Sequence, residues 1–65
     1  MRTMDTLWIE DLILADALRA WADRDGPREA RIAADVIERC ETHTAAIRVQ
    51  AETLRIIAER ALERS

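Results

Sequence analysis

The sequence contains a single cysteine and a single histidine, Cys40 and His43, which lie three residues apart. On a helix this spacing directs both side chains to one face, where a thiolate and an imidazole are suitable zinc ligands. In a two-fold dimer, two of each could complete a tetrahedral site. Cysteine is also common as a small buried hydrophobe, and we favour that interpretation. A metal-binding bundle that uses Cys40 and His43 remains an alternative, and we predict no cofactor.

Cys40 and His43 are also the natural candidates for a nucleophile and its general base. Covalent catalysis needs in addition an orienting group, an oxyanion site and a pocket. A helical chain of 65 residues offers little concavity, and the pair would lie within a helix rather than on a mobile loop. We therefore predict that the protein is not an enzyme and has no catalytic residues.

Three polar residues, one of them His43, fall on or beside the apolar faces of the predicted helices. Glu10 lies near the middle of the apolar face of the first helix, where it would be a buried acid, the partner of an arginine of the second helix, or a first-turn residue that reaches solvent. His43 and Gln50 lie seven residues apart at the edge of the apolar stripe of the second helix. Buried polar residues of this kind fix helix register, so we favour structural roles for all three.

Residue types that dominate protein interfaces occur near the N-terminus. Trp8, Leu12, Ala15 and Arg19 recur at helical spacing, and tryptophan and arginine are enriched among interface hot spots. This stripe predicts a contact with either a second copy or another protein. Together with residues of the second helix, the predicted interface comprises Trp8, Leu12, Arg19, Ile47, Leu54, Ile57 and Leu62.

These side chains must be positioned by helices, because the only strong break in the sequence is Asp25-Gly26-Pro27. Asp and Gly favour a turn, and Pro favours the first position of a helix. The break predicts a short helix over about residues 6–22, capped by Asp5 or Thr6, and a long helix over about residues 27–64.

The short helix is predicted to be apolar on two sides. Its main apolar face contains Leu7, Ile9, Ile13, Leu14, Ala17, Leu18, Ala20 and Trp21. The opposite side carries the charged residues Asp5, Asp11, Asp16, Arg19 and Asp23, interrupted by the stripe that begins at Trp8. A helix that is apolar on two sides is usually buried on two sides, which a lone hairpin cannot achieve.

The long helix carries a coiled-coil pattern of about four heptads: Ala33, Ile37, Cys40, Thr44, Ile47, Ala51, Leu54, Ala58 and Ala61. At 1.5 Å per residue it would span roughly 55 Å against about 25 Å for the short helix. Its distal half would then need another chain. The alternative is a three-helix bundle with a break near residues 42–44, where helix propensity is low. We favour the unbroken helix, because neither Gly nor Pro marks a break.

Composition agrees with a single all-α domain over residues 1–65 that assembles into an oligomeric helical bundle. Glycine and proline occur once each, and with one cysteine no disulfide can form within the chain. A domain this small is only marginally stable alone, which favours a homo-oligomer, most simply a dimer. No apolar run is long enough to span a bilayer, and we expect a cytoplasmic protein that does not bind membranes.

The charge pattern excludes nucleic acid as a partner, because the net charge is −3 and the arginines have acidic neighbours. Arginine without lysine, with abundant alanine, suggests a bacterial or phage origin. We predict a small structural or regulatory protein–protein interaction module that acts as a self-associating helical bundle. The alternative is a phage- or plasmid-encoded inhibitor or adaptor that occludes a basic, nucleic-acid-binding surface of a target protein.

Overall fold

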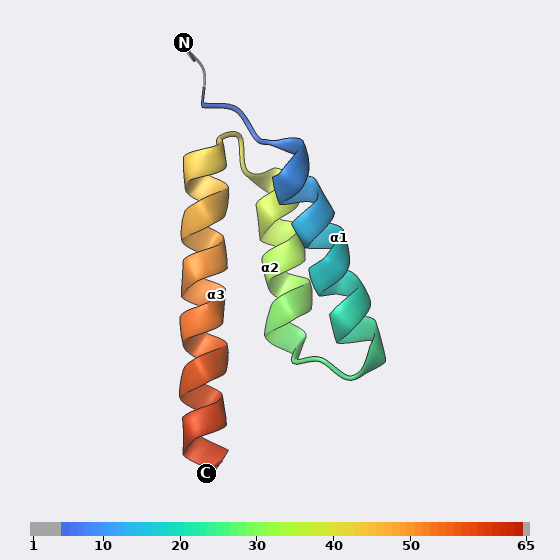
Figure 1. Cartoon of the computed structure of the whole chain (residues 1–65), viewed down its shortest axis with the longest axis vertical. Helices are drawn as coiled ribbons and strands as arrows, with labels where there is room; N and C mark the ends of the chain where they lie inside the picture. Colours follow the sequence, from blue (N-terminus) through green and yellow to red (C-terminus); the bar gives the residue numbers. More distant parts are fainter. Residues whose placement is uncertain (1–4, 65) are drawn as a thin grey trace.

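The computed structural model describes residues 5–64, and these residues form three helices without any strand. The helices are α1 (Ile9–Arg24), α2 (Arg28–Arg39) and α3 (His43–Arg64). Each runs antiparallel to the one before it, and α2 packs against both of the others (Figure 1). The predicted all-α class is confirmed. Residues 1–4 and 65, which belong to the predicted domain, lie outside the described range.

Helix α1 begins at Ile9, three residues later than predicted, because Trp8 and Asp11 form its first turn. The backbone N–H of Trp8 donates to the Asp11 carboxylate at 3.0 Å, and the N–H of Asp11 donates back to the Trp8 carbonyl at 3.0 Å. A carboxylate at the third helical position that reaches back to the N-cap is one half of a capping box. Asp5 and Thr6 lie outside the helix and do not cap it.

The turn after α1 is closed by Gly26. The N–H groups of Asp25 and Gly26 both donate to the carbonyl of Trp21, at 3.2 and 2.8 Å. A Cβ atom at position 26 would lie only 2.8 Å from the indole of Trp21. Only glycine therefore lets the tryptophan ring lie against this turn.

The predicted continuous helix over residues 27–64 is wrong, because the chain leaves the helical conformation at Cys40–Thr42. The three-helix alternative describes the fold, and the break lies slightly before residues 42–44. Cys40 is extended, with φ −69° and ψ 145°, and Thr42 caps the next helix. The Thr42 hydroxyl accepts a hydrogen bond from the N–H of Ala45 at 3.1 Å. A threonine that caps a new helix competes with helix continuation, so neither Gly nor Pro is required.

The core is small and is lined mostly by alanine. Ala15, Ala34, Ile37 and Ala46 are buried together, with Leu7, Leu18, Cys40 and Val49 partly buried around them. Ile37 is the only large side chain that is fully buried among the described residues. The small side chains let the three helices approach closely, but they shield little apolar surface. The molecule measures 46 × 21 × 16 Å, and α1 and α3 make few contacts with each other.

Candidate functional site

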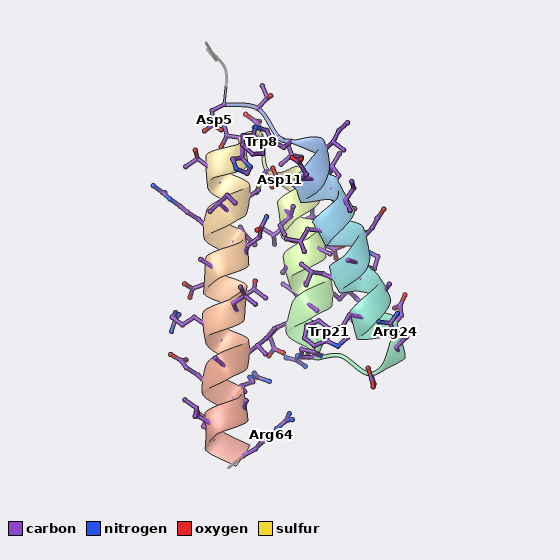
Figure 2. The ribbon with its side chains drawn as sticks, in the orientation of Figure 1. Asp5, Trp8, Asp11, Trp21, Arg24 and Arg64 are labelled. Carbon is purple, nitrogen blue, oxygen red and sulfur yellow. The ribbon has the colours of Figure 1, made fainter. Side chains whose placement is uncertain are left out.

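Asp11 is the centre of a buried polar cluster between α1 and α3. Its side chain is only 2% exposed and accepts hydrogen bonds from the Trp8 N–H and from Gln50 Nε2 at 3.3 Å. His43 Nδ1 lies 2.8 Å from the same carboxylate. Figure 2 shows Asp5, Trp8 and Asp11 beside the first turns of α3. The cluster joins two helices that otherwise make few contacts with each other.

The prediction that Asp11 lies on the polar side of the first helix was wrong, and of the outcomes left open for Glu10 the structure shows exposure to solvent. We expected Glu10 on the apolar face and Asp11 on the polar side, whereas Glu10 is exposed and Asp11 is buried. The face that packs inward carries Asp11, Ala15 and Leu18, because alanine permits the close approach of α2 and three hydrogen bonds compensate the carboxylate. The capping-box spacing of Trp8 and Asp11 is the sequence signal that could have revealed it.

The segment before α1 lies across the start of α3. The rings of Trp8 and His43 stack with centroids 3.4 Å apart and planes 4° from parallel. The carboxylate of Asp5 accepts a hydrogen bond from the N–H of Thr44 at 3.2 Å. The pKa of Asp5 is lowered chiefly by hydrogen bonding to the Thr44 side chain, with a smaller contribution from this backbone bond. His43 and Gln50, the two polar residues predicted beside the apolar stripe, both contact α1 through Asp11.

Electrostatics in the cluster favour an ionised Asp11. Burial alone raises the pKa of this carboxyl group. The hydrogen bonds from His43, Trp8 and Gln50, with the attraction of His43, outweigh burial and hold the pKa below its ordinary value of 3.8. Every buried side-chain nitrogen and oxygen among the described residues has a hydrogen-bond partner. All buried polar atoms of the cluster are thus hydrogen-bonded, and the cluster holds α1 against α3.

Cys40 and His43 do not share a helix face, because the chain between them is not helical. Cys40 is the residue that ends α2, and its thiol donates to the carbonyl of Val36 at 3.2 Å. His43 begins α3 and is held by Asp11. Over residues 5–64, no group of three or more histidine, cysteine or acidic side chains is arranged to hold a metal ion. The geometric premise of the metal-binding alternative is therefore wrong for a single chain.

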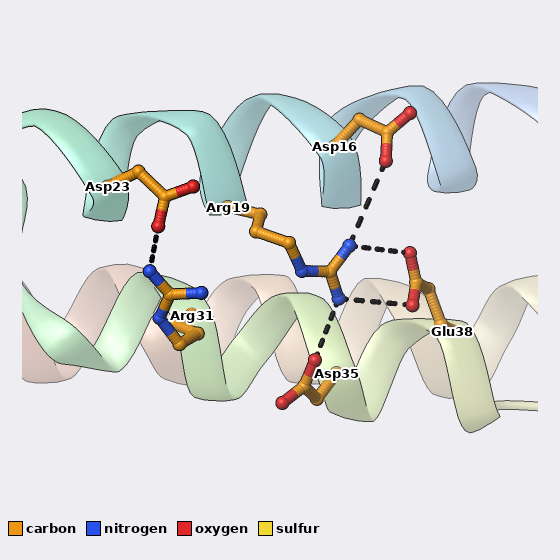
Figure 3. Close-up of polar contacts among 6 residues, drawn as sticks. All are labelled: Asp16, Arg19, Asp23, Arg31, Asp35 and Glu38. Carbon is orange, nitrogen blue, oxygen red and sulfur yellow. Dashed lines mark hydrogen bonds and ion pairs between the residues drawn. The ribbon is translucent and has the colours of Figure 1, made fainter.

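Arg19, a predicted interface residue, is engaged within its own chain. Its guanidinium binds Asp35 at 2.7 Å and Glu38 at 2.9 Å on α2 (Figure 3). The hydrogen bond from Arg19 is the main cause that lowers the pKa of Glu38, and the two acids together raise the pKa of Arg19. A second ion pair, between Asp23 and Arg31, lies on the same side of the α1–α2 hairpin. These contacts hold α1 to α2.

Helix α3 carries a second apolar face that no part of the described chain covers. Ala46, Val49 and Thr53 pack inward, whereas Leu54 is 66% exposed and Leu62 is 74% exposed. We call the uncovered face the α3 stripe: Ile47, Ala51, Leu54, Ala58 and Leu62, all exposed and spaced by four, three, four and four residues. Ile57, also predicted at the interface, is half-buried and lies outside this stripe.

Helix α1 also exposes apolar residues that we had placed on its buried face. Ile9 is 74% exposed and Ile13 is 61% exposed, so the prediction that they pack inward was wrong. The acids Glu10 and Asp16 lie beside them and are exposed as well. Of the predicted stripe, Ala15 is fully buried, whereas Leu12 and Trp8 remain partly accessible.

Among the described helices, none is long and apolar enough to cross a bilayer.

The total surface is large for a chain of this mass. The molecule exposes 4907 Å². A compact monomer of 7.4 kDa is expected to expose about 4,200 Å², so the excess is roughly 700 Å². Large side chains of α1 and α3, among them Ile9, Leu54 and Leu62, are uncovered and contribute to this surface. No protein-family model matches the sequence, and comparison with curated proteins and with solved structures shows no significant similarity.

Proposed function

We propose that this protein is a small structural or regulatory interaction module that associates with a second copy of itself through the α3 stripe. The exposure of Leu54 and Leu62 in a regular apolar row is the observation that carries the proposal. Apolar residues spaced three or four apart form one face of a helix, and two such faces can pair. Ala51 and Ala58 lie between the larger residues of the row, so a second helix can approach closely.

The surface area supports a dimer of ordinary size. Each partner in a stable protein interface buries about 800 Å², roughly a sixth of the 4907 Å² that this chain exposes. Pairing of the α3 stripes would cover the largest unshielded side chains of α3 and supply stability that the alanine-lined core lacks.

Sedimentation equilibrium over a concentration series tests this proposal. The wild-type protein should be dimeric at micromolar concentration, and Leu54→Glu should raise the dissociation constant at least about tenfold, because it places a charge in the apolar interface. Ile32→Glu is the matched control, since Ile32 is 55% exposed on α2, away from the stripe. A wild-type monomer, or equal effects of the two substitutions, would contradict the proposal.

A second candidate function is binding of a basic protein surface by the outer face of α1. Ile9 and Ile13 are exposed there, between the exposed acids Glu10 and Asp16. Within residues 5–64 Glu10 has no ion-pair partner, and Asp16 lies 3.8 Å from Arg19, which is bound more closely to α2. An apolar row with acidic flanks is complementary to an amphipathic basic helix, such as one that binds nucleic acid.

The probe for this second function is a synthetic amphipathic helix of leucine and lysine, with its leucine–glutamate counterpart as the control peptide. The basic peptide should bind more weakly as salt rises, and a Glu10→Gln, Asp16→Asn double variant should weaken binding about threefold or more. The matched control is Glu52→Gln, Glu63→Gln, which removes two exposed acids of α3. If both double variants bind alike, the attraction is general and the outer face of α1 is not the site.

A further inference from the structure

A pocket of about 380 Å³ opens between the end of α1, the α1–α2 turn and the last turns of α3. Trp21, Pro27 and Ile57 provide its apolar walls. Its volume falls within the range of about 300–1,000 Å³ that is usual for small-molecule sites. The pocket lies away from the Asp11 cluster and away from the side of the hairpin that carries the ion pairs of Arg19.

The pocket is built by two local features of the chain. Gly26 lacks a Cβ that would collide with the Trp21 indole, so the ring lies against the turn and forms a wall. Helix α3 has 22 residues against 12 in α2, and Arg60 bonds to Glu29 at 2.7 Å across the α2–α3 contact. This ion pair fixes the distal part of α3 beside the start of α2, which keeps the pocket between them.

The rim of the pocket is basic although the chain is acidic overall. Three arginines line it, Arg28, Arg60 and Arg64, against the two acids Asp25 and Glu29. Arg60 is neutralised by Glu29, whereas Arg28 and Arg64 have no ion-pair partner within residues 5–64. Figure 2 shows Arg64 extending from the end of α3 toward the side on which Trp21 lies.

We propose that this pocket binds a small amphipathic carboxylate. The guanidinium groups of Arg28 and Arg64 hold the anion, because arginine presents paired N–H donors that match the two carboxylate oxygens. Trp21 and Ile57 hold an aliphatic or aromatic body of the ligand by apolar contact. This activity is additional to self-association, since one chain supplies the whole site.

Fluorescence of Trp21 measures the binding directly. In a Trp8→Phe background Trp21 is the only indole, and octanoate titrated into this variant should change its emission with saturation. Octanamide has a similar chain without the charge, and sulfate has charge without the chain. Octanamide should bind about tenfold more weakly than octanoate because it lacks the charge that the arginines hold. Sulfate should also bind about tenfold more weakly, because it lacks the apolar contacts with Trp21 and Ile57.

Variants assign the binding to the pocket. Arg28→Gln, Arg64→Gln should weaken octanoate binding about tenfold while circular dichroism shows an unchanged helix content. Arg48→Gln, which changes an exposed arginine of α3 outside the pocket, should leave the affinity unchanged. Equal affinity for octanoate and octanamide, equal affinity for sulfate, or absence of saturation would each overturn the proposal.

One further variant separates this proposal from the proposed function. Leu54→Glu places a charge in the α3 stripe but changes none of the residues that line the pocket. Octanoate should therefore bind the Leu54→Glu variant as tightly as it binds the wild-type protein. If the wild-type protein proves monomeric but binds octanoate, the self-association proposal fails and the ligand site stands. If the wild-type protein dimerises without binding octanoate, the ligand site fails and the self-association proposal stands.

Discussion

At the scale of single residues, Asp11 shows how a charged side chain can be part of a core. The carboxylate is buried, yet three hydrogen bonds and the attraction of His43 stabilise its ionised form. Its neighbours depend on it in turn, because Gln50 and the Trp8 N–H lose an acceptor if it is removed. A satisfied buried carboxylate of this kind contributes to specificity of packing as well as to stability.

We predict that Asp11→Ala lowers the free energy of unfolding by about 2 kcal/mol at neutral pH, because it leaves buried donors without an acceptor. Asp16→Ala is the matched control, since the Asp16 side chain is 82% exposed, and it should change stability by less than about 0.5 kcal/mol. Urea unfolding of the three proteins measures both values. A similar loss in the two variants would show that the buried hydrogen bonds contribute little.

The same residue predicts a pH dependence whose sign follows from its lowered pKa. The contribution of ionised Asp11 is complete above the ordinary value of 3.8 and is lost as pH falls through the lower pKa of the folded state. The difference in unfolding free energy between wild type and Asp11→Ala should therefore shrink when pH falls below 3.8. A difference that stays constant across that range would contradict the assignment.

At the scale of elements, the break between α2 and α3 has a defined cause in Thr42. Its hydroxyl and carbonyl both accept N–H groups from the first turn of α3, at 3.1 Å from Ala45 and 3.2 Å from Ala46. The apolar heptads continue across the break in the sequence, but they face different neighbours before and after it. Thr42 turns one long amphipathic segment into two antiparallel helices.

We predict that Thr42→Ala destabilises the protein by about 1 kcal/mol, the usual cost of removing an N-cap side chain. Thr6→Ala is the matched control, because Thr6 is a plausible cap in the sequence yet lies outside α1. It should change the unfolding free energy by less than about 0.3 kcal/mol. Thermal unfolding of both variants distinguishes them, and equal effects would show that Thr42 is not the cap that defines α3.

At the scale of the whole molecule, the arrangement of the three helices leaves apolar side chains of α1 and α3 uncovered, and association would shield those of α3. Helix α2 is covered on two sides, whereas α1 and α3 each have only one helical neighbour along most of their length (Figure 1). If a second copy covers the α3 stripe, the thermal midpoint must rise with protein concentration, by mass action. Leu54→Glu should abolish that dependence, and this readout is independent of sedimentation.

The sequence by itself determined the all-α class, the turn at Gly26 and the presence of more apolar helix surface than one chain can bury. Composition, a Gly-Pro break and periodicity are local properties, so they can be read without the fold. It also identified His43 and Gln50 as polar residues beside an apolar face. Only the tertiary structure decided that Asp11 rather than Glu10 is buried, that Arg19 binds α2, and that the long segment folds back at Thr42. Those outcomes depend on which neighbours a face meets, and helical periodicity alone cannot supply that information.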